Sequence, residues 1–384
     1  MELFSLKYTI PYLIFLGYLL LLMIWEIAKS SKGQSIKDIQ WLTIIGFVFF
    51  FGLRGFVGTD WVNYYPFFNT AGEYFSWEPG FTLYTLLIKS IHPNYFFWIF
   101  VSSLTNAVLL HIIFKRYAKY YVLGFIVFLA FNGIIMEINL MRNIKSILIF
   151  LVSLKYLQER KILPYMLLNL LGVTFHISSI LFLPLYFVLH REIPKLYLWI
   201  MFAGGMFVFF LQIAYIKPVM SFFAEIIGGR LPGLVEAYFG DQRMNFHMLF
   251  SIGTIERIFS FVLIMFMREK LIAQDKNNNI FINLFMIFFF ICFYIAEANE
   301  ITTRLSTLFI ASYWILYPNI LAVTKKTLNY QLLLLFIVAL SIMRTSMYNS
   351  FLFRYDNILF GIESFETRRD LWERYSDGGV IITD

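Results

Sequence analysis

Long apolar runs separated by short polar segments recur along the whole chain. An α-helix needs about 20 apolar residues to cross the hydrocarbon core of a bilayer, and many of these runs approach that length. The pattern therefore predicts an all-α, polytopic integral membrane helical bundle of about twelve spans, in a range of about eleven to thirteen. The predicted spans are residues 8–28, 41–53, 95–114, 121–136, 143–157, 162–175, 177–189, 196–216, 248–267, 280–297, 303–322 and 328–348.

Short apolar segments complicate this pattern. Several predicted spans fall short of a full crossing, which indicates tilted or broken helices. Segment 79–92 has apolar residues at helical spacing but is too short to span, so we predict a short re-entrant or interfacial helix there. Residues 8–28 lack a basic leading segment and a small-residue cleavage site, which favours a retained first helix over a signal peptide.

Composition supports a membrane protein without a sizeable soluble domain. Of the 384 residues, 60% are hydrophobic and only 14% are charged, whereas a soluble domain has about a quarter charged residues. The net charge of +7 requires no nucleic-acid partner, because the basic residues concentrate in short loops. The single cysteine, Cys292, cannot form an internal disulfide or a thiolate cluster for a metal.

The distribution of charge orients the spans, because loops rich in Lys and Arg stay in the cytoplasm. Loops 29–40 and 115–120 carry net charges of +2 and +3, which places them inside. Segments 54–78 and 349–384 carry net charges of −2 and −3, and segment 217–247 is balanced. These three segments, and with them both termini, are predicted to lie outside.

This reasoning gives a single transmembrane bundle over residues 1–348, with extracytoplasmic loops at 54–78 and 217–247. Residues 349–384 are predicted to form an extracytoplasmic tail, with one amphipathic helix at about 363–375. The predicted location is the bacterial inner (cytoplasmic) membrane, crossed many times.

Ionisable residues at the edge of a span are costly, so they mark candidate functional sites. The first group follows the second predicted span and contains Arg54, Asp60, Asn63 and Tyr64. Two glycines permit a tight backbone path between Arg54 and Asp60, which could then pair. The alternative is an ordinary interfacial loop with an aromatic belt.

A second group of polar residues lies at the same predicted edge. Glu78 precedes segment 79–92, and Glu137, Asn139 and Arg142 lie in a short outer loop between two spans. The alternative is that these charges only reach the membrane surface and neutralise one another. Arg142 fits this alternative poorly, because the positive-inside rule does not favour an arginine outside.

Two more groups follow later in the chain. His176 lies between two apolar runs, where a histidine often serves only as an interhelical hydrogen-bond donor. Glu300 and Arg304 are four residues apart on a predicted helix and can pair. The alternative for this pair is simple mutual neutralisation.

Together, outward arginines beside carboxylates indicate an anionic ligand, because the guanidinium fork suits phosphate or pyrophosphate. A carboxylate such as Asp60, Glu78 or Glu137 could act as general base toward a hydroxyl group. Metal-binding and nucleotide-binding motifs do not occur in a suitable context, so neither a metal nor a cofactor is predicted.

The order and spacing of these residues resemble the EpsG family of Wzy-like polysaccharide polymerases, over about residues 40–320. The resemblance rests on Arg54-Gly-x-x-Gly-Thr-Asp60-x-x-Asn63-Tyr64, Glu78-x-Gly80-Phe81, Asn139-x-x-Arg142, Phe175-His176-x-Ser178-Ser179 and a late Arg304. Asn143 departs from the family, whose members commonly have glutamine there.

The resemblance implies a metal-independent glycosyltransferase that joins undecaprenyl-pyrophosphate-linked oligosaccharide repeat units, as donor and acceptor, at the outer leaflet. It also implies a fold like that of lipid-dependent (GT-C-like) glycosyltransferases, and a chain-length regulator and a flippase as partners. The expected catalytic residues are Asp60, Glu78, Glu137 and His176. The expected pyrophosphate- and substrate-binding residues are Arg54, Asn63, Tyr64, Asn139, Arg142, Glu300 and Arg304.

Three other classes stay open. A ligase that hands a finished glycan to another acceptor is closest, and only the family pattern speaks against it. A transporter or flippase would place its key charges near the bilayer midplane rather than at the outer edge. An integral-membrane O-acyltransferase would use a histidine beside an acid, whereas His176 stands alone in the sequence. The sequence distinguishes neither the sugars and linkage nor capsule, O-antigen or exopolysaccharide as the product.

Overall fold

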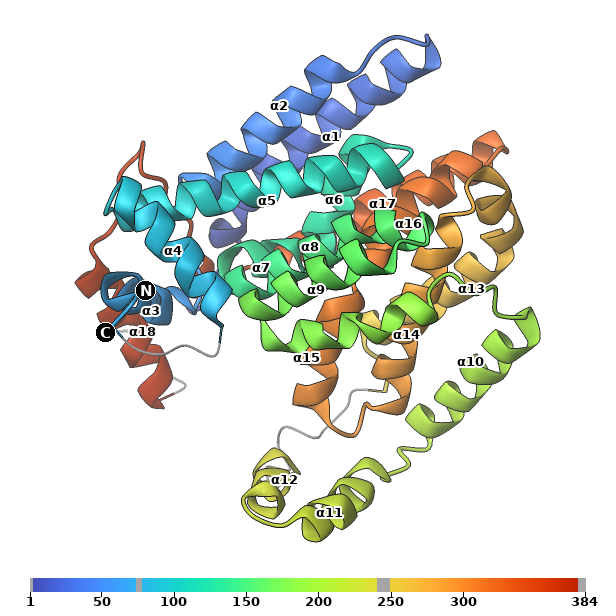
Figure 1. The fold of residues 1–384 in the computed structure, drawn as a ribbon. Coiled ribbons are helices and arrows are strands. Elements are labelled where there is room, and N and C mark those ends of the chain that lie inside the picture. Colours follow the sequence, from blue (N-terminus) through green and yellow to red (C-terminus); the bar gives the residue numbers. More distant parts are fainter. Residues whose placement is uncertain (1–2, 74–77, 240–248, 379–384) are drawn as a thin grey trace. The chain divides into compact units, whose positions relative to one another are not determined.

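The computed structural model describes residues 3–73, 78–239 and 249–378, and helices dominate all of them (Figure 1). Within this part of the chain, extended backbone pairs only at isolated bridges, such as that between Arg54 and Asn357. The predicted all-α class is therefore confirmed. The chain forms two compact units, residues 1–186 with 313–384, and residues 187–312. That the spans belong to one bundle stays a prediction.

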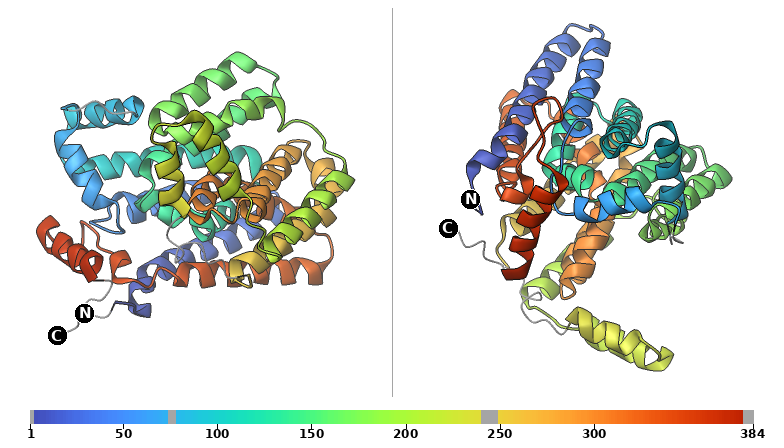
Figure 2. Two further views of the ribbon diagram at one scale, coloured as in Figure 1. Left: turned by 90° about the horizontal axis from the view of Figure 1, so that it is seen from below. Right: turned by 90° about the vertical axis from the view of Figure 1, so that its left-hand side faces the viewer.

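The first unit contains the residues that surround Glu78. Its α-helices are α1 (Ile10–Ser31), α2 (Lys37–Phe47), α3 (Trp61–Thr70), α4 (Pro79–Ile91), α5 (Tyr95–Tyr117), α6 (Tyr121–Phe128), α7 (Ile134–Ile138), α8 (Met141–Gln158), α9 (Ile162–Phe175), most of α16 (Ala311–Val323), α17 (Thr327–Ser346) and α18 (Phe365–Gly378). Short 3-10 or π turns connect them at η1 (Leu6–Thr9), η2 (Val48–Gly52), η3 (Leu129–Gly133), η4 (Ile177–Phe182) and η6 (Phe351–Phe353). Helices α1 and α17 pack side by side (Figure 2).

The second unit begins at Phe187, the last residue of η5 (Pro184–Phe187), and ends at Ser312, near the start of α16 (Ala311–Val323). Its helices are α10 (Lys195–Phe210), α11 (Ile216–Ile227), α12 (Leu231–Phe239), α13 (Ile252–Gln274), α14 (Asn278–Tyr294) and α15 (Asn299–Phe309). The predicted outer loop 217–247 is thus largely the helices α11 and α12, and its residues 240–247 lie outside the described residues.

Several helices are long and apolar enough to cross a membrane. Among the described residues there are four, or five if α15 and α16 form one bent span. Four shorter apolar helices of 10–17 residues accompany them. These features support a multi-pass membrane protein, and the count of about twelve spans stays a prediction. The four long candidates are Leu6–Ser31, Tyr95–Tyr117, Tyr121–Ile138 and Thr327–Ser346.

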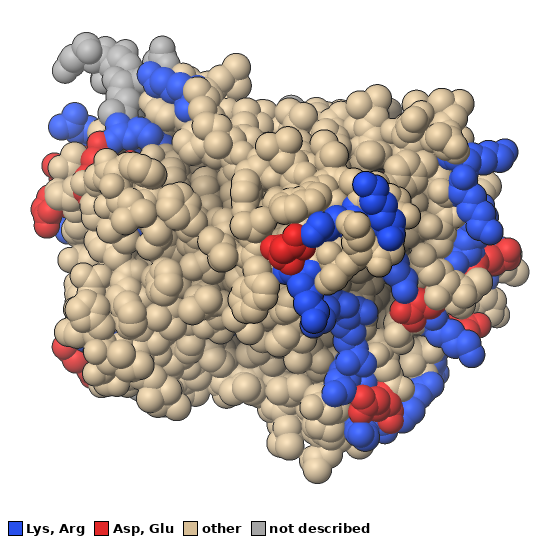
Figure 3. Space-filling model, turned by 90° about the horizontal axis from the view of Figure 1, so that it is seen from above, with Lys and Arg blue, Asp and Glu red and all other residues tan. Residues whose placement is uncertain are grey.

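Exposed apolar side chains agree with a lipid environment. Leu21 of α1, Leu163 of α9 and Leu335 of α17 are each more than 60% exposed. A soluble helix would present polar residues at such positions. Figure 3 shows one face of the molecule on which uncharged residues cover wide areas while Lys and Arg gather in limited regions.

Two predicted spans differ from regular α-helices. Segment 177–189 forms the short 3-10 helices η4 and η5, with Pro184 at their junction, where a proline cannot donate a backbone hydrogen bond. Span 121–136 breaks at Asn132, whose φ is 65°. The indole nitrogen of Trp314 donates to the carbonyl of Phe131 at 3.0 Å, which satisfies a backbone group at the break.

The N-terminus, the loop after η2 and the C-terminal segment meet at one end of the first unit. Ser5 N donates to Asn349 O at 2.8 Å, and Gly58 N donates to Leu352 O at 2.8 Å. At the far end of α1, the Glu26 carboxylate accepts from Tyr121 N at 2.6 Å, next to basic loop 115–120. The charge pattern likewise predicts that segments 54–78 and 349–384 lie on one side of the membrane and loop 115–120 on the other. Which of the two ends faces outward stays a prediction.

Candidate active site

The carboxylate of Glu78 bridges the side chains of Arg142 and His176, which come from distant parts of the first unit. Its Oε2 lies 2.6 Å from Nη1 of Arg142, and its Oε1 lies 2.7 Å from Nδ1 of His176. Glu78 precedes α4, Arg142 lies in the first turn of α8, and His176 follows α9. Its side chain is only 9% exposed, whereas that of Arg142 is 46% exposed. His176 was expected to stand alone, and that expectation is wrong.

Gly80 explains how α4 comes so close to His176. Pro79 occupies the first turn of α4, where a missing backbone N–H costs nothing. A Cβ atom built on Gly80 would lie 2.0 Å from Oγ1 of Thr174, two residues before His176. Only a residue without a side chain permits this approach, so the Glu78-x-Gly80 spacing serves the contact between α4 and α9.

Asn139 fixes the loop that carries the first group of polar residues. Its side chain accepts from Thr59 N at 3.0 Å and donates to Thr59 Oγ1 at 3.0 Å. Its carbonyl accepts from the hydroxyl of Tyr64 at 2.9 Å. Gly58 has a φ of 87°, and a Cβ there would lie 2.1 Å from the Asn139 amide oxygen. The glycine, threonine and tyrosine of this motif therefore dock α3 against the start of α8.

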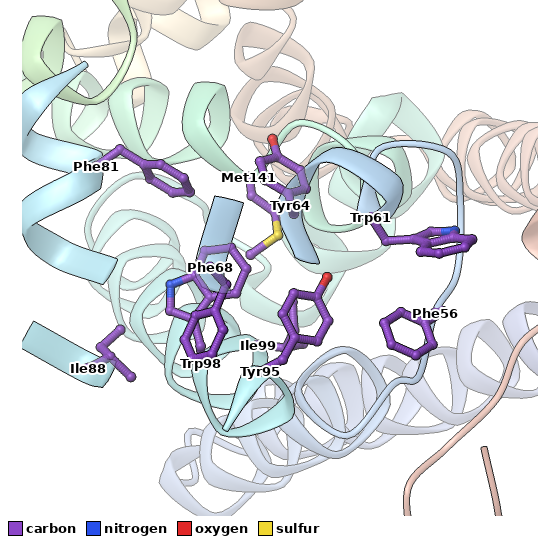
Figure 4. Close-up of a cluster of buried hydrophobic side chains, with 10 residues drawn as sticks. All are labelled: Phe56, Trp61, Tyr64, Phe68, Phe81, Ile88, Tyr95, Trp98, Ile99 and Met141. Atoms are coloured by element: carbon purple, nitrogen blue, oxygen red, sulfur yellow. The ribbon is translucent and has the colours of Figure 1, made fainter. Parts of the chain in front are cut away.

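A cavity of about 170 Å³ opens beside the ion pair. Its lining residues are Asn63, Tyr64, Phe67, Glu78, Phe81 and Arg142. Two of these lining residues, Tyr64 and Phe81, belong to a cluster of buried aromatic side chains that also includes Phe68 and Trp98 (Figure 4). Side chains of this cluster come from α3, α4 and α5 and hold these helices together. The cluster thereby supports the polar groups at the cavity.

The electrostatics of the site favour an ionised Glu78. Burial raises the pKa of Glu78, but the hydrogen bond with His176 and the charge of Arg142 outweigh it, so the pKa is lowered overall. Burial raises the pKa of Asp60, and Thr59 and Arg142 offset only part of this rise. Burial also raises the pKa of Tyr64 to about 12, so its phenol stays protonated near neutral pH.

Arg54 and Glu137 take positions that differ from their expected roles. Arg54 is 3% exposed, and its guanidinium donates to Ser103 Oγ at 3.1 Å and to Glu137 O at 2.6 Å. Its guanidinium is therefore held by interior partners, whereas Asp60 accepts from the hydroxyl of Thr59, and a part of Arg54 in ligand binding stays a prediction. Glu137 is 1% exposed, accepts from Nδ2 of Asn106 at 3.0 Å, and is not among the residues that line the cavity.

Lys145 belongs to the same interior network. It is 2% exposed, and its Nζ donates to Ser102 Oγ at 2.6 Å and to Asn106 Oδ1 at 3.3 Å. Lys145 therefore lies in the interior and not at a membrane surface. A buried amino group of this kind requires hydrogen-bond partners, and Asn106 links it to the side chain of Glu137.

Glu300 and Arg304 lie on α15 in the second unit. Their side chains pair as expected, with Nη2 of Arg304 2.5 Å from Oε1 of Glu300. Both are substantially exposed. Their part in binding a ligand stays a proposal.

Two cavity residues were not assigned a role from the sequence. Phe67 and Phe81 line the cavity, with ring centroids 5.5 Å apart in a stacked arrangement. Phe81 belongs to the Glu78-x-Gly80-Phe81 motif, whereas nothing marks Phe67 among 46 phenylalanines. Among the described residues, no group of three or more His, Cys, Asp and Glu side chains could hold a metal ion.

Comparisons with known proteins agree with the motif order. The model of the EpsG family matches residues 38–357, which make up most of the chain. The residues around Glu78 lie within this range. No curated protein and no solved structure matches the chain. The match spans the loop after η2, the start of α4, the start of α8 and the end of α9, so the chain belongs to the EpsG family, a family of Wzy-like polysaccharide polymerases.

Proposed function

We propose that this chain joins undecaprenyl-pyrophosphate-linked oligosaccharide repeat units at the outer face of the bacterial cytoplasmic membrane, without a metal ion. The observation that carries the proposal is Glu78, held between Arg142 and His176 at the wall of a cavity. Membership of the EpsG family supports the polymerase class. The lipid-linked substrate, the outward orientation and the roles below are our proposals.

Arg142 binds the pyrophosphate of the donor. One guanidinium nitrogen holds Glu78, while the side chain as a whole stays 46% exposed beside the cavity. It lies in the first turn of α8, where the partial positive charge of the helix N-terminus also favours an anion. Charge that develops on the leaving pyrophosphate is stabilised here at the moment the glycosidic bond breaks.

Glu78 accepts the proton of the acceptor hydroxyl. Its lowered pKa keeps it ionised near neutral pH, and its contacts with Arg142 and His176 fix the orientation of the carboxylate. The acceptor oxygen forms a bond to the anomeric carbon of the donor, and the bond from that carbon to the lipid pyrophosphate breaks. The electron pair leaves with the pyrophosphate, and the proton moves to Glu78.

His176 acts as a positioning residue. Its Nδ1 meets the Glu78 oxygen that Arg142 does not hold, and it does not line the cavity itself. An integral-membrane O-acyltransferase would also use a histidine beside an acid, and His176 lies beside Glu78. The arginine on the same carboxylate and the family membership favour glycosyl transfer instead.

A deletion strain tests the proposal. It should display a surface glycan of one repeat unit, because synthesis and flipping of the unit precede polymerisation. Lipid-linked units that fail to reach the outer leaflet would instead support a flippase. Full-length polymer that fails only to reach its final acceptor would support a ligase.

Complementation of the deletion then tests the site. Glu78→Gln should lower polymerisation by about 10²- to 10⁴-fold, the usual contribution of a general base. Glu73→Gln removes an exposed acid shortly before Glu78 and should restore wild-type chain length. Wild-type chains from Glu78→Gln, at normal abundance in the membrane, would refute the role of Glu78.

A further inference from the structure

Helix α18 lies beyond the residues that match the family model, yet it packs against the loop that builds the cavity. The match ends at residue 357, and α18 spans Phe365–Gly378. The intervening chain pairs with the loop after η2, since Ile358 N donates to Leu53 O at 2.9 Å and Gly55 N donates to Asp356 O at 3.0 Å. The C-terminal segment is thus joined by backbone hydrogen bonds to the start of the site motif.

Arg368 anchors α18 to this segment. It is 4% exposed, with Nη2 2.8 Å from Asp356 Oδ1 and Nε 2.8 Å from Glu363 Oε2. The same Nη2 donates to the carbonyl of Arg354 at 2.9 Å. A buried arginine with two carboxylates holds one geometry, because leaving any partner uncompensated is costly. The neighbouring Arg369 is different, since it is exposed and, among the residues that the structure describes, pairs along the helix with Glu373.

Phe365, one turn before Arg368, contacts the N-terminal half of α3. Its ring stacks on Tyr65 with centroids 4.5 Å apart, and it meets the edge of Trp61 at 5.5 Å. Trp61 and Tyr65 flank Asn63 and Tyr64, two residues that line the cavity. A contact at this place therefore acts directly on one wall of the site.

Helix α3 needs such support. It has only 10 residues, contains Pro66, and its N-cap residue Asp60 makes no side-chain capping bond. A helix this short is marginal without tertiary contacts, and an internal proline weakens it further. Asn139 holds one side of α3 through Tyr64, and Phe365 holds the other through Tyr65.

We propose that Phe365 and Arg368 are positioning residues that set the α3 wall of the cavity for substrate binding. Arg368 fixes α18, and Phe365 holds α3 so that Asn63 and Tyr64 stand opposite Arg142. The inference rests on the proposed function. It assigns α18 to substrate binding, whereas Glu78 acts in the chemical step, and the two roles are separable by kinetics.

Full-length variants in proteoliposomes, supplied with lipid-linked repeat units, test this assignment. Phe365→Ala and Arg368→Gln should raise KM by roughly 3- to 10-fold, the size of one aromatic contact, with kcat within about twofold of wild type. Phe365→Tyr keeps the ring and should restore the wild-type KM. Arg369→Gln makes the same charge change on the exposed face of α18 and should leave both constants unchanged.

The outcomes separate this inference from the proposed function. If Phe365→Ala keeps the wild-type KM while Glu78→Gln loses kcat, α18 has no positioning role and the proposed function stands. If the KM effect follows only from lower abundance of folded protein, α18 is structural and the inference is overturned. If Glu78→Gln keeps the wild-type kcat, the proposed function fails instead.

Discussion

Oε1 of Glu78 lies 2.7 Å from Nδ1 of His176, although 98 residues separate them in the chain. The contact joins the start of α4 to the end of α9, and Arg142 reaches the other oxygen of the same carboxylate from α8. Three motifs that look independent in the sequence therefore meet on one carboxylate. The distance between α4 and α9 decides whether this arrangement forms.

Gly80→Ala should disrupt the site through packing alone. The added Cβ would lie 2.0 Å from Thr174 Oγ1 and 3.1 Å from the Thr174 carbonyl carbon, so α4 must move away from α9. Overpacking of this kind costs about 1–3 kcal/mol and would pull Glu78 from His176. We expect shorter glycan chains and a lower thermal stability of the purified protein.

Gly17→Ala is the matched control for this change. A Cβ at Gly17, in α1, meets nothing within 4 Å, so alanine should be neutral or slightly stabilising in that helix. Equal chain lengths and melting temperatures for Gly80→Ala and wild type would show that the close approach of α4 to α9 is not required.

The pH dependence of polymerisation should report the His176 contact. Activity requires ionised Glu78, so it falls as the pH drops through the Glu78 pKa, which lies below the ordinary value of about 4.3. His176→Ala removes the hydrogen bond that lowers this pKa while burial still raises it. The acid limb of kcat should therefore move to higher pH. His92→Ala, at an exposed histidine, should leave the limb in place, and an unmoved limb in His176→Ala would contradict the pairing.

The sequence predicts many of the residues that form this site, but it does not predict the contacts between them. Glu78, Asn139, Arg142 and His176 stand out because polar groups at membrane edges are costly. That Arg142 and His176 share the carboxylate of Glu78 depends on how α4, α8 and α9 pack, which local patterns do not encode. The close pairing of Gly80 with Thr174 is likewise visible only in three dimensions.

Arg54 shows what reasoning from charge alone does not reveal. An arginine in a predicted outer loop suggests an anion site, because the positive-inside rule gives it no other reason to be there. The structure supplies another reason, since Arg54 fills its hydrogen bonds inside the protein, including one to the backbone of Glu137. Burial separates this structural role from the exposed side chain of Arg142, and no periodicity distinguishes the two.

Sidedness of the membrane is open to a direct test. In a Cys292→Ala background, single cysteines at Glu73 and Glu366 should react with an impermeant maleimide in intact cells, while those at Lys32 and Lys119 should not. All four positions are exposed. The backbone pairing between the loop after η2 and the C-terminal segment requires the first two to behave alike. Labelling at Lys119 from outside would overturn the predicted topology and the re-entrant assignment of α4.

Arg142→Lys separates a pyrophosphate ligand from a simple surface cation. Lysine keeps the charge but loses the planar fork that can hold Glu78 and an oxyanion together. A hydrogen bond to a charged group contributes about 1.5–3 kcal/mol, so polymerisation should fall by roughly 10- to 100-fold at normal protein abundance. Arg116→Lys is the matched control, because Arg116 is exposed in the last turn of α5, in basic loop 115–120. This variant should retain wild-type chain lengths. If Arg142→Lys gives wild-type chain lengths on a gel, the guanidinium fork of Arg142 is not required for polymerisation. Arg304 would then become the leading candidate for the pyrophosphate ligand.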